Sequence, residues 1–241
     1  MMISIIVPAF NEERYLPSTL AAVNRSVAVL EARHRVSVEI VVVDNASTDG
    51  TAAIATSLGA RVVFELEHNI ARVRNRGAEA ARGEVILFVD ADTLIEAELL
   101  TRVYELMQDQ ECSGGAAAIR WRLRNRFLHW YFSSAASLAK WLGLAQGASQ
   151  FCRREVFRAT GGYDESLHMA EDADFYWRLR KYARRVGRRI ELITDLPVLP
   201  STRRYEIWPV WRTLLWTNPL VIVLFCRTRF CWRGWYDELV R

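Results

Sequence analysis

Residues 84–92, with the sequence EVILFVDAD, join a continuous apolar run to two carboxylates one residue apart. A short apolar run bounded by polar residues predicts a buried strand over 84–89. Two aspartates that follow such a strand, Asp90 and Asp92, can share a hard divalent cation, because Mg²⁺ and Mn²⁺ prefer oxygen ligands. The alternative is that both acids cap the next helix.

The chain upstream and downstream of this segment alternates apolar runs with helical spacing. This alternation predicts an α/β fold with a mostly parallel, doubly wound sheet flanked by helices. The other predicted strands of this half are 3–7, 39–43 and 61–65. The predicted helices are 13–33, 47–58, 70–82 and 96–108.

Sheets of this type bind ligands at the carboxyl ends of their strands. Three predicted strands end in polar clusters, PAFNE (8–12), DNAS (44–47) and DAD (90–92), so folding should gather them at one edge. Asp44 could accept hydrogen bonds from a base or ribose, or it could form only an Asx turn.

Three arginines lie two residues apart in the helix predicted over 70–82: Arg72, Arg74 and Arg76. Side chains two apart on a helix point in different directions, so all three cannot meet one ligand. One of them can clamp a phosphate, while the others are solvated.

The second half of the chain has a different pattern. Arginines at 120, 122, 124 and 126 alternate with other residues, which predicts a strand with one basic face. An aromatic-rich helix is expected over 127–142 and a second helix over 171–185. Glu171 and Asp172 open the latter, either because acids are favoured at a helix N-terminus or because one is a general base for an attacking hydroxyl.

Composition limits the class of protein. The 241 residues are 51% hydrophobic and 25% charged, with a net charge of +4, as expected for one large α/β domain or two small ones. The four cysteines are scattered, which disfavours a disulfide scaffold or structural zinc site and fits a cytoplasmic, reducing location. The first residues lack a basic leader, so we expect no signal peptide. Nucleic-acid binding is disfavoured, because the charge is modest and no reader motif is present.

The C-terminal region mixes Trp, Leu, Val, Phe and Arg over 208–235, including Arg212, Arg227, Arg229 and Arg233. Trp favours membrane interfaces and Arg can reach anionic headgroups, so peripheral attachment to a membrane is one interpretation. The alternatives are a core helix packed on the sheet and a dimer contact. No apolar stretch of ~18 residues is present, so we expect no transmembrane helix.

Five segments, in order, resemble the inverting glycosyltransferases of family 2, which adopt the GT-A fold. They are IIVPAFNE (5–12), VVDNASTDGT (42–51), RNRG (74–77), DAD (90–92), and GGYD (161–164) followed by EDAD (171–174). The resemblance covers about three quarters of the chain. It implies a GT-A domain over 1–200, with a nucleotide-binding half (1–110) and an acceptor-binding half (111–200). Residues 201–241 are then an aromatic-rich helical extension.

The resemblance also implies roles for individual residues around a nucleotide-sugar donor, for which we expect a UDP-sugar. Residues after the first strand line the nucleotide pocket in this family, which implies this position for Pro8, Ala9 and Glu12. The acid that ends the second strand, Asp44, would contact the nucleobase. Arg74 would lie near the donor.

The two aspartates of the DAD segment divide their roles in the family: Asp90 would contact the nucleotide, and Asp92 the Mg²⁺ or Mn²⁺ ion. Asp172 would be the catalytic base that takes a proton from the acceptor hydroxyl during a single inverting displacement. Some members use a downstream His as a metal ligand. Residues 201–205 (STRRY) contain none, so Arg203 or Arg204 would instead hold the diphosphate directly.

The acceptor that we expect is a saccharide or a lipid-linked molecule. A lipid-linked acceptor would be convenient if the C-terminal region attaches to the cytoplasmic face of a membrane. A nucleotidyltransferase of related fold is the alternative enzyme, but it would favour a Gly-rich basic loop in place of residues 8–12. A third interpretation is a non-catalytic, membrane-associated partner subunit. The presence of Asp90, Asp92 and Asp172 favours the glycosyltransferase.

Overall fold

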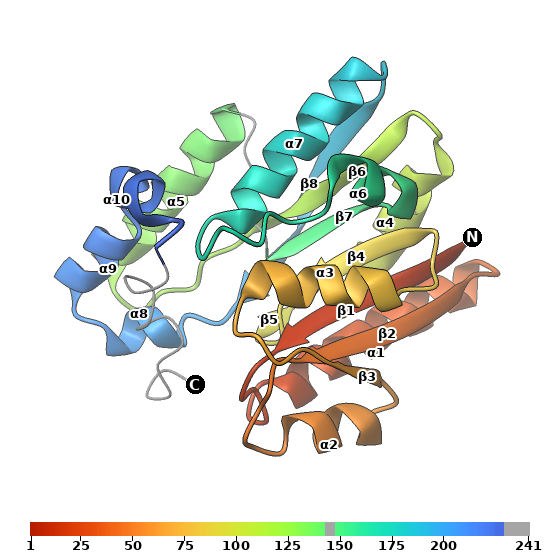
Figure 1. Cartoon of the computed structure of the whole chain (residues 1–241), viewed down its shortest axis with the longest axis horizontal. Coiled ribbons are helices and arrows are strands. Elements are labelled where there is room, and N and C mark those ends of the chain that lie inside the picture. The colour runs from red at the N-terminus through yellow and green to blue at the C-terminus, as the bar shows by residue number, and fades with distance from the viewer. Residues whose placement is uncertain (143–147, 229–241) are drawn as a thin grey trace.

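The computed structural model describes residues 1–142 and 148–228, and an eight-stranded sheet runs through both halves of the chain (Figure 1). The strand order is β3-β2-β1-β4-β7-β6-β8-β5. The strands are β1 (Met2–Ala9), β2 (Ser37–Asp44), β3 (Arg61–Phe64), β4 (Val85–Val89), β5 (Thr93–Leu94), β6 (Cys112–Ile119), β7 (Ser149–Arg153) and β8 (Arg189–Pro200).

The helices cover both faces of the sheet, and the C-terminal ones gather beside α5 at one side of the molecule (Figure 1). They are α1 (Leu16–Arg33), α2 (Thr51–Ser57), α3 (Ile70–Ala80), α4 (Leu99–Gln108), α5 (Arg126–Leu142), α6 (Arg154–Thr160), α7 (Glu171–Arg185), α8 (Arg203–Ile207), α9 (Val210–Trp216) and α10 (Pro219–Phe225). The α/β alternation predicted for the first half is therefore confirmed.

The central strands are buried on both faces, because alternate side chains enter different cores. Ile3, Ile5 and Val7 of β1 pack in one apolar cluster with side chains of α1 and α4. Ile6 of β1 and Phe88 of β4 pack in the other, with side chains of α3, α6 and α7. Each such side chain stabilises the fold by about 1.5–3 kcal/mol when it is fully buried. This two-sided burial explains the uninterrupted apolar runs in the sequence.

The register brings the predicted polar clusters to one edge. β1 and β2 are parallel, with Ala9 opposite Asp44, and β1 and β4 are parallel, with Ile6 opposite Phe88. Asp90 and Asp92 therefore follow β4 at the edge where Pro8 and Ala9 end β1. The first half of the sheet is parallel, whereas β7 pairs antiparallel with both β4 and β6.

The strand predicted over 120–126 is wrong. β6 ends at Ile119, residues 120–125 form neither strand nor helix, and α5 begins at Arg126. The side chain of Asn125 accepts hydrogen bonds from the backbone N–H groups of Phe127 and Leu128, which caps the new helix. The alternation marks instead a segment lying over an apolar cluster, with Trp121 buried and the arginines exposed.

The C-terminal extension is mainly helical in its described part, which runs to Thr228. Arg229, Arg233 and the last tryptophans of the extension lie outside the described residues. Within 1–142 and 148–228, none of the helices combines the length and the apolar character needed to span a bilayer. The boundaries at residues 110 and 200 stay a prediction, since the sheet is continuous across the first of them.

Candidate active site

A cavity of about 430 Å³ lies at the carboxyl edge of β1 and β4. It takes in nine of the ten site residues expected from the sequence: Pro8, Ala9, Glu12, Arg74, Asp90, Asp92, Asp172, Arg203 and Arg204. The side chains come from the first strand, α3, the loop after β4, α7 and α8, so residues almost 200 positions apart share one space. This is the position at which ligands bind in open α/β sheets.

Arg74 of α3 contacts carboxylates on two elements that border the cavity, the loop after β4 and the start of α7. Its guanidinium donates to Asp90 Oδ1 at 2.8 Å through Nη2 and to Glu171 through Nη1. The Arg74 and Glu171 side chains are only 4% and 9% exposed. Burial opposes the charge on Arg74, but the neighbouring carboxylates of Asp90 and Glu171 hold its pKa well above the usual range. Burial, with Asp172 adjacent, raises the pKa of Glu171 despite the attraction of Arg74.

The GGYD turn (161–164) contacts Arg74 through the ring of Tyr163. The Arg74 guanidinium lies 5.3 Å from the centroid of the buried Tyr163 ring. Tyr163 donates from its hydroxyl to Gln150 Oε1 at 2.8 Å, and Gln150 Nε2 donates to the backbone carbonyl of Asp172 at 2.9 Å. This chain of contacts joins the turn, the sheet and the start of α7, and it fixes where Asp172 enters the cavity.

Asp172 lies in the first turn of α7, and its carboxylate accepts from the backbone N–H of Ala173 at 2.7 Å. The residue before the helix, Ala170, has a φ of +61°. A non-glycine residue in the left-handed region is uncommon, and such strain is concentrated at functional sites. Asp172 lines the same cavity as Asp90 and Asp92.

A second ion-pair cluster lines the same cavity. Arg203 contacts both carboxylate oxygens of Glu12, with Nη1 to Oε2 at 2.8 Å, and its Nη2 lies 3.4 Å from Asp92 Oδ2. The guanidinium also stacks over the Tyr15 ring at 4.3 Å. Burial and the neighbouring Glu12 raise the pKa of Asp92 to about 7, against the attraction of Arg203. Sequence reasoning placed Glu12 and Arg203 in the pocket but did not anticipate that they pair.

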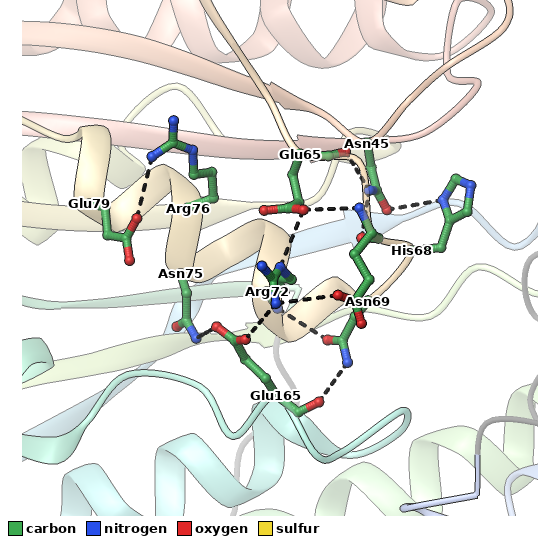
Figure 2. A network of polar contacts seen from close by, with 10 residues as sticks. Asn45, Glu65, His68, Asn69, Arg72, Asn75, Arg76, Glu79 and Glu165 are labelled. Carbon is green, nitrogen blue, oxygen red and sulfur yellow. Dashed lines mark hydrogen bonds and ion pairs between the residues drawn. The ribbon is translucent and has the colours of Figure 1, made fainter.

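The three arginines of α3 separate as expected. Arg74 alone faces the cavity, while Arg72 contacts Glu65 at 3.3 Å and Glu165 at 3.5 Å (Figure 2). Arg76 lies at 3.5 Å from Glu79 on the same helix. Figure 2 shows that this outer network also ties α3 to the loop that carries Glu165, where Asn75 donates to Glu165 Oε1 at 2.9 Å.

Asp44 is the one expected residue outside the cavity wall. It ends β2 and is buried, and its Oδ1 accepts from the backbone N–H of Ser47 at 3.3 Å. Its neighbour Asn45 lines the cavity instead, and donates to the backbone carbonyls of Glu65 and Glu67. This bond reaches three residues along the chain, whereas an Asx turn bonds the backbone two residues on. The contact between Asp44 and a nucleobase stays a prediction.

The charges that line the cavity indicate whether it would bind a metal ion. Five carboxylates line it against three arginines, before any anionic donor enters. A divalent cation would offset this surplus, and the carboxylate oxygens of Asp90 and Asp92 are ligands that Mg²⁺ and Mn²⁺ accept. Across the described part of the chain, no three acidic, His or Cys side chains cluster closely enough to hold an ion by themselves. The residues therefore fit an ion that is completed by phosphate oxygens.

Several functional candidates were missed from the sequence. His168 lines the cavity and was not singled out. Glu171 was expected as a helix-start acid or a general base, but its ion pair with Arg74 was not anticipated. The segment HMAED (168–172) held this signal, since it puts a His three residues before the helix that Glu171 and Asp172 open. The aromatic wall was also missed; it consists of Trp121, Tyr131, Phe132, Tyr205 and Trp216.

Residues 4–162 match the family model described as glycosyl transferase family 2. The chain belongs to this family. An uncharacterized glycosyltransferase of Nostoc sp. is 31% identical over 120 residues, which cover 47% of this chain and 35% of the relative. The match thus spans about a third of that relative's length.

Two solved structures show the same fold. TarS of S. aureus (residues 1–349) in complex with UDP-GlcNAc has a TM-score of 0.64 and 19% identity, over 92% of this chain and 66% of TarS. The mannosyltransferase PcManGT of Pyrobaculum calidifontis in complex with GDP-Man and Mn²⁺ has a TM-score of 0.64 and 20% identity, over 98% of this chain and 64% of PcManGT. The family 2 chain therefore has the GT-A fold, as the resemblance implied.

Proposed function

We propose that this family 2 chain transfers a sugar from a nucleotide-diphosphate sugar to an acceptor hydroxyl, with inversion at the anomeric carbon. The observation that carries the proposal is the convergence of Asp90, Asp92 and Asp172 on one cavity, although Asp172 is some 80 residues further along the chain. Nucleotide-sugar complexes of fold relatives, one with UDP-GlcNAc and one with GDP-Man and Mn²⁺, support the donor class. We take a UDP-sugar as the first donor to test.

The reaction we propose is one displacement. Asp172 takes the proton from the acceptor hydroxyl while the oxygen attacks the anomeric carbon and the bond to the diphosphate breaks. A divalent cation held by Asp92 together with Asp90 would stabilise negative charge on the departing diphosphate. Arg74 holds Asp90 in place, and Arg203 and Arg204 lie where they could add positive charge.

The cavity also suggests how the donor enters. Arg203 is held by Glu12 and stacked on Tyr15, so it is ordered before any ligand binds. An ordered cation loses less entropy on binding a diphosphate than a mobile one. The nucleoside would then lie toward Pro8, Ala9 and Asn45 on the side of β1 and β2, and the acceptor toward α7.

The test is release of nucleotide from a panel of UDP- and GDP-sugars, with saccharide and lipid-linked acceptors and Mn²⁺, followed by the Asp172→Asn variant. We expect the variant to lose transfer by at least about 10³-fold while its affinity for nucleotide and Mn²⁺, measured by calorimetry, changes less than about threefold. The matched control is Asp174→Asn in the same helical turn, because Asp174 pairs with Arg178 at 2.7 Å and does not line the cavity.

Three outcomes would contradict the proposal. An active Asp172→Asn variant would exclude this base. Formation of a nucleotide sugar and pyrophosphate from a nucleoside triphosphate and a sugar 1-phosphate would indicate the nucleotidyltransferase. A chain that binds no nucleotide and releases none from any donor would instead favour a non-catalytic partner subunit. Configuration of the product at the anomeric carbon, read by NMR, tests inversion separately.

A further inference from the structure

The C-terminal helices form a layer with α5, here called the helical layer (α5, α9 and α10), at one side of the sheet (Figure 1). An aromatic cluster attaches it: Phe132 of α5 packs on Trp121 and Tyr205, with ring centroids 4.8 and 4.6 Å apart. Tyr131 and Thr217 exchange hydrogen bonds between α5 and the turn after α9. The inner side of the layer is therefore specified by packing.

The outer side of the helical layer leaves large apolar side chains in water. On α10, Leu220, Val223 and Leu224 are 74%, 73% and 73% exposed, and their spacing puts them on one face of the helix. Trp211 of α9 and Trp130 of α5 are 67% and 63% exposed. Exposed apolar side chains that are grouped in this way mark an interaction surface.

The sequence around this layer is basic. Residues 112–154 contain no Asp or Glu, and residues 203–228 contain only Glu206. Arginines 120, 122, 124 and 126 are all exposed at the start of α5. The surface therefore combines exposed Trp and Leu with an almost unopposed positive charge.

We propose that the helical layer is a docking surface for an anionic lipid bilayer. Trp is favoured at the level of lipid headgroups, the Leu and Val side chains of α10 can enter the acyl boundary, and the arginines attract anionic lipids. A symmetric dimer through the same face fits less well, because an isologous contact would bring each basic segment toward its own copy without acids to pair with it. The positive charge of this surface therefore favours an anionic bilayer over a second copy of the chain.

In the docked orientation, one end of the cavity lies next to the bilayer, and a lipid-linked acceptor would enter there. This step rests on the proposed function. Ala135 of α5, Trp216 of α9 and Ile222 of α10 belong to the inner wall of the same cavity that holds Asp172. The helices that face the lipid on one side therefore border the catalytic cavity on the other. A hydroxyl carried by a lipid would reach Asp172 through this apolar end.

The experiment is co-sedimentation of the full chain with vesicles of phosphatidylcholine alone and with added phosphatidylglycerol. We expect binding to the anionic vesicles, weakened by salt, and much less to the neutral ones. The test variant is Leu220→Glu, which removes one exposed apolar side chain and adds a negative charge. It should lower the vesicle partition coefficient about tenfold or more.

The matched control is Leu66→Glu, because Leu66 is 80% exposed but lies in the loop after β3 and not in the helical layer. It should leave vesicle binding within about twofold, and both variants should keep the thermal midpoint of the parent chain. Absence of binding to anionic vesicles would overturn the proposal, as would an equal loss in both variants. A dimer that dissociates in Leu220→Glu, without vesicle binding, would assign the surface to a second copy. Vesicle binding needs no sugar transfer, so it fails or succeeds independently of the proposed enzyme.

Discussion

Replacement of Arg74 by Met is the perturbation that tests the site architecture most directly. Met keeps most of the side-chain length but removes the charge that pairs with Glu171 and Asp90. The Glu171 side chain is 9% exposed, so its carboxylate would remain buried without a cation. Breaking one partner of a buried ion pair costs about 3–5 kcal/mol, because the remaining charge is uncompensated. For a chain of this size, we expect a fall in Tm of about 10 °C.

The chain supplies its own control. Arg33 and Glu98 also form an Arg–Glu ion pair, with contacts of 2.7 and 3.0 Å, but their side chains are 53% and 46% exposed. Solvent screens such a pair, so Arg33→Met should cost less than about 1 kcal/mol. The assay is urea unfolding of both variants at about pH 8, above the pKa of about 7 that burial gives Glu171 in the parent chain.

A double-mutant cycle completes the test. Glu171→Met added to Arg74→Met removes the unpaired charge, so the double variant should regain about 2 kcal/mol or more relative to Arg74→Met alone. The single variant should also depend on pH. Without Arg74, the folded-state pKa of Glu171 rises further above its unfolded value, so the native state holds an extra proton at low pH. The free energy of unfolding of Arg74→Met, relative to the parent, should therefore recover as the pH falls and decline as the pH rises.

A loss below about 1 kcal/mol in Arg74→Met, equal to that in the Arg33→Met control, would refute the reasoning. So would a double variant no more stable than Arg74→Met. Either result would mean that the Arg74–Glu171 contact is solvated in solution, and that the link between α3 and α7 does not depend on it.

Two further substitutions test the packing that positions the site. Gly77→Ala should destabilise the fold by about 1–3 kcal/mol in urea unfolding, because its Cβ would lie 2.3 Å from Ile6 Cγ2 and 2.9 Å from Val43 Cγ2; an unchanged midpoint would mean that α3 can move away from the sheet. Tyr163→Phe leaves Gln150 Oε1 without its buried donor and should cost about 1–2 kcal/mol. It should also lower kcat more than it raises the donor KM, since Gln150 contacts the start of α7; a change in KM alone would separate Tyr163 from the positioning of Asp172.

Much of the site was accessible from the sequence because its positions follow local rules. Asp90 and Asp92 come just after a short apolar run that predicts a buried strand, and parallel strands share their carboxyl edge. Helix 171–185 was predicted with its exact bounds, since three acids mark its start and two arginines its last turn. By contrast, the alternation over 120–126 carried the right exposure pattern but formed no strand, because a helix cap at Asn125 ends the segment.

The second half of the sheet escaped prediction for a physical reason. β6 has the sequence CSGGAAAI, which lacks the β-branched and aromatic residues typical of strands. Its glycines are explained only by neighbours: a Cβ on Gly115 would lie 2.0 Å from the Glu191 carbonyl oxygen, and one on Gly114 2.3 Å from that of Phe151. Small residues are needed there because the adjacent strands approach closely, which no local pattern reveals.

The sequence by itself determined the α/β class, the edge at which the polar clusters meet and most of the charged residues that line the cavity, because strand and helix periodicities are local properties. Only the tertiary structure decided which charges pair: Arg74 with Glu171 and Arg203 with Glu12, across 97 and 191 positions. Contacts between such distant residues depend on how the helices dock on the sheet, and on which side chains that docking removes from water. The same docking leaves the outer face of α10 exposed.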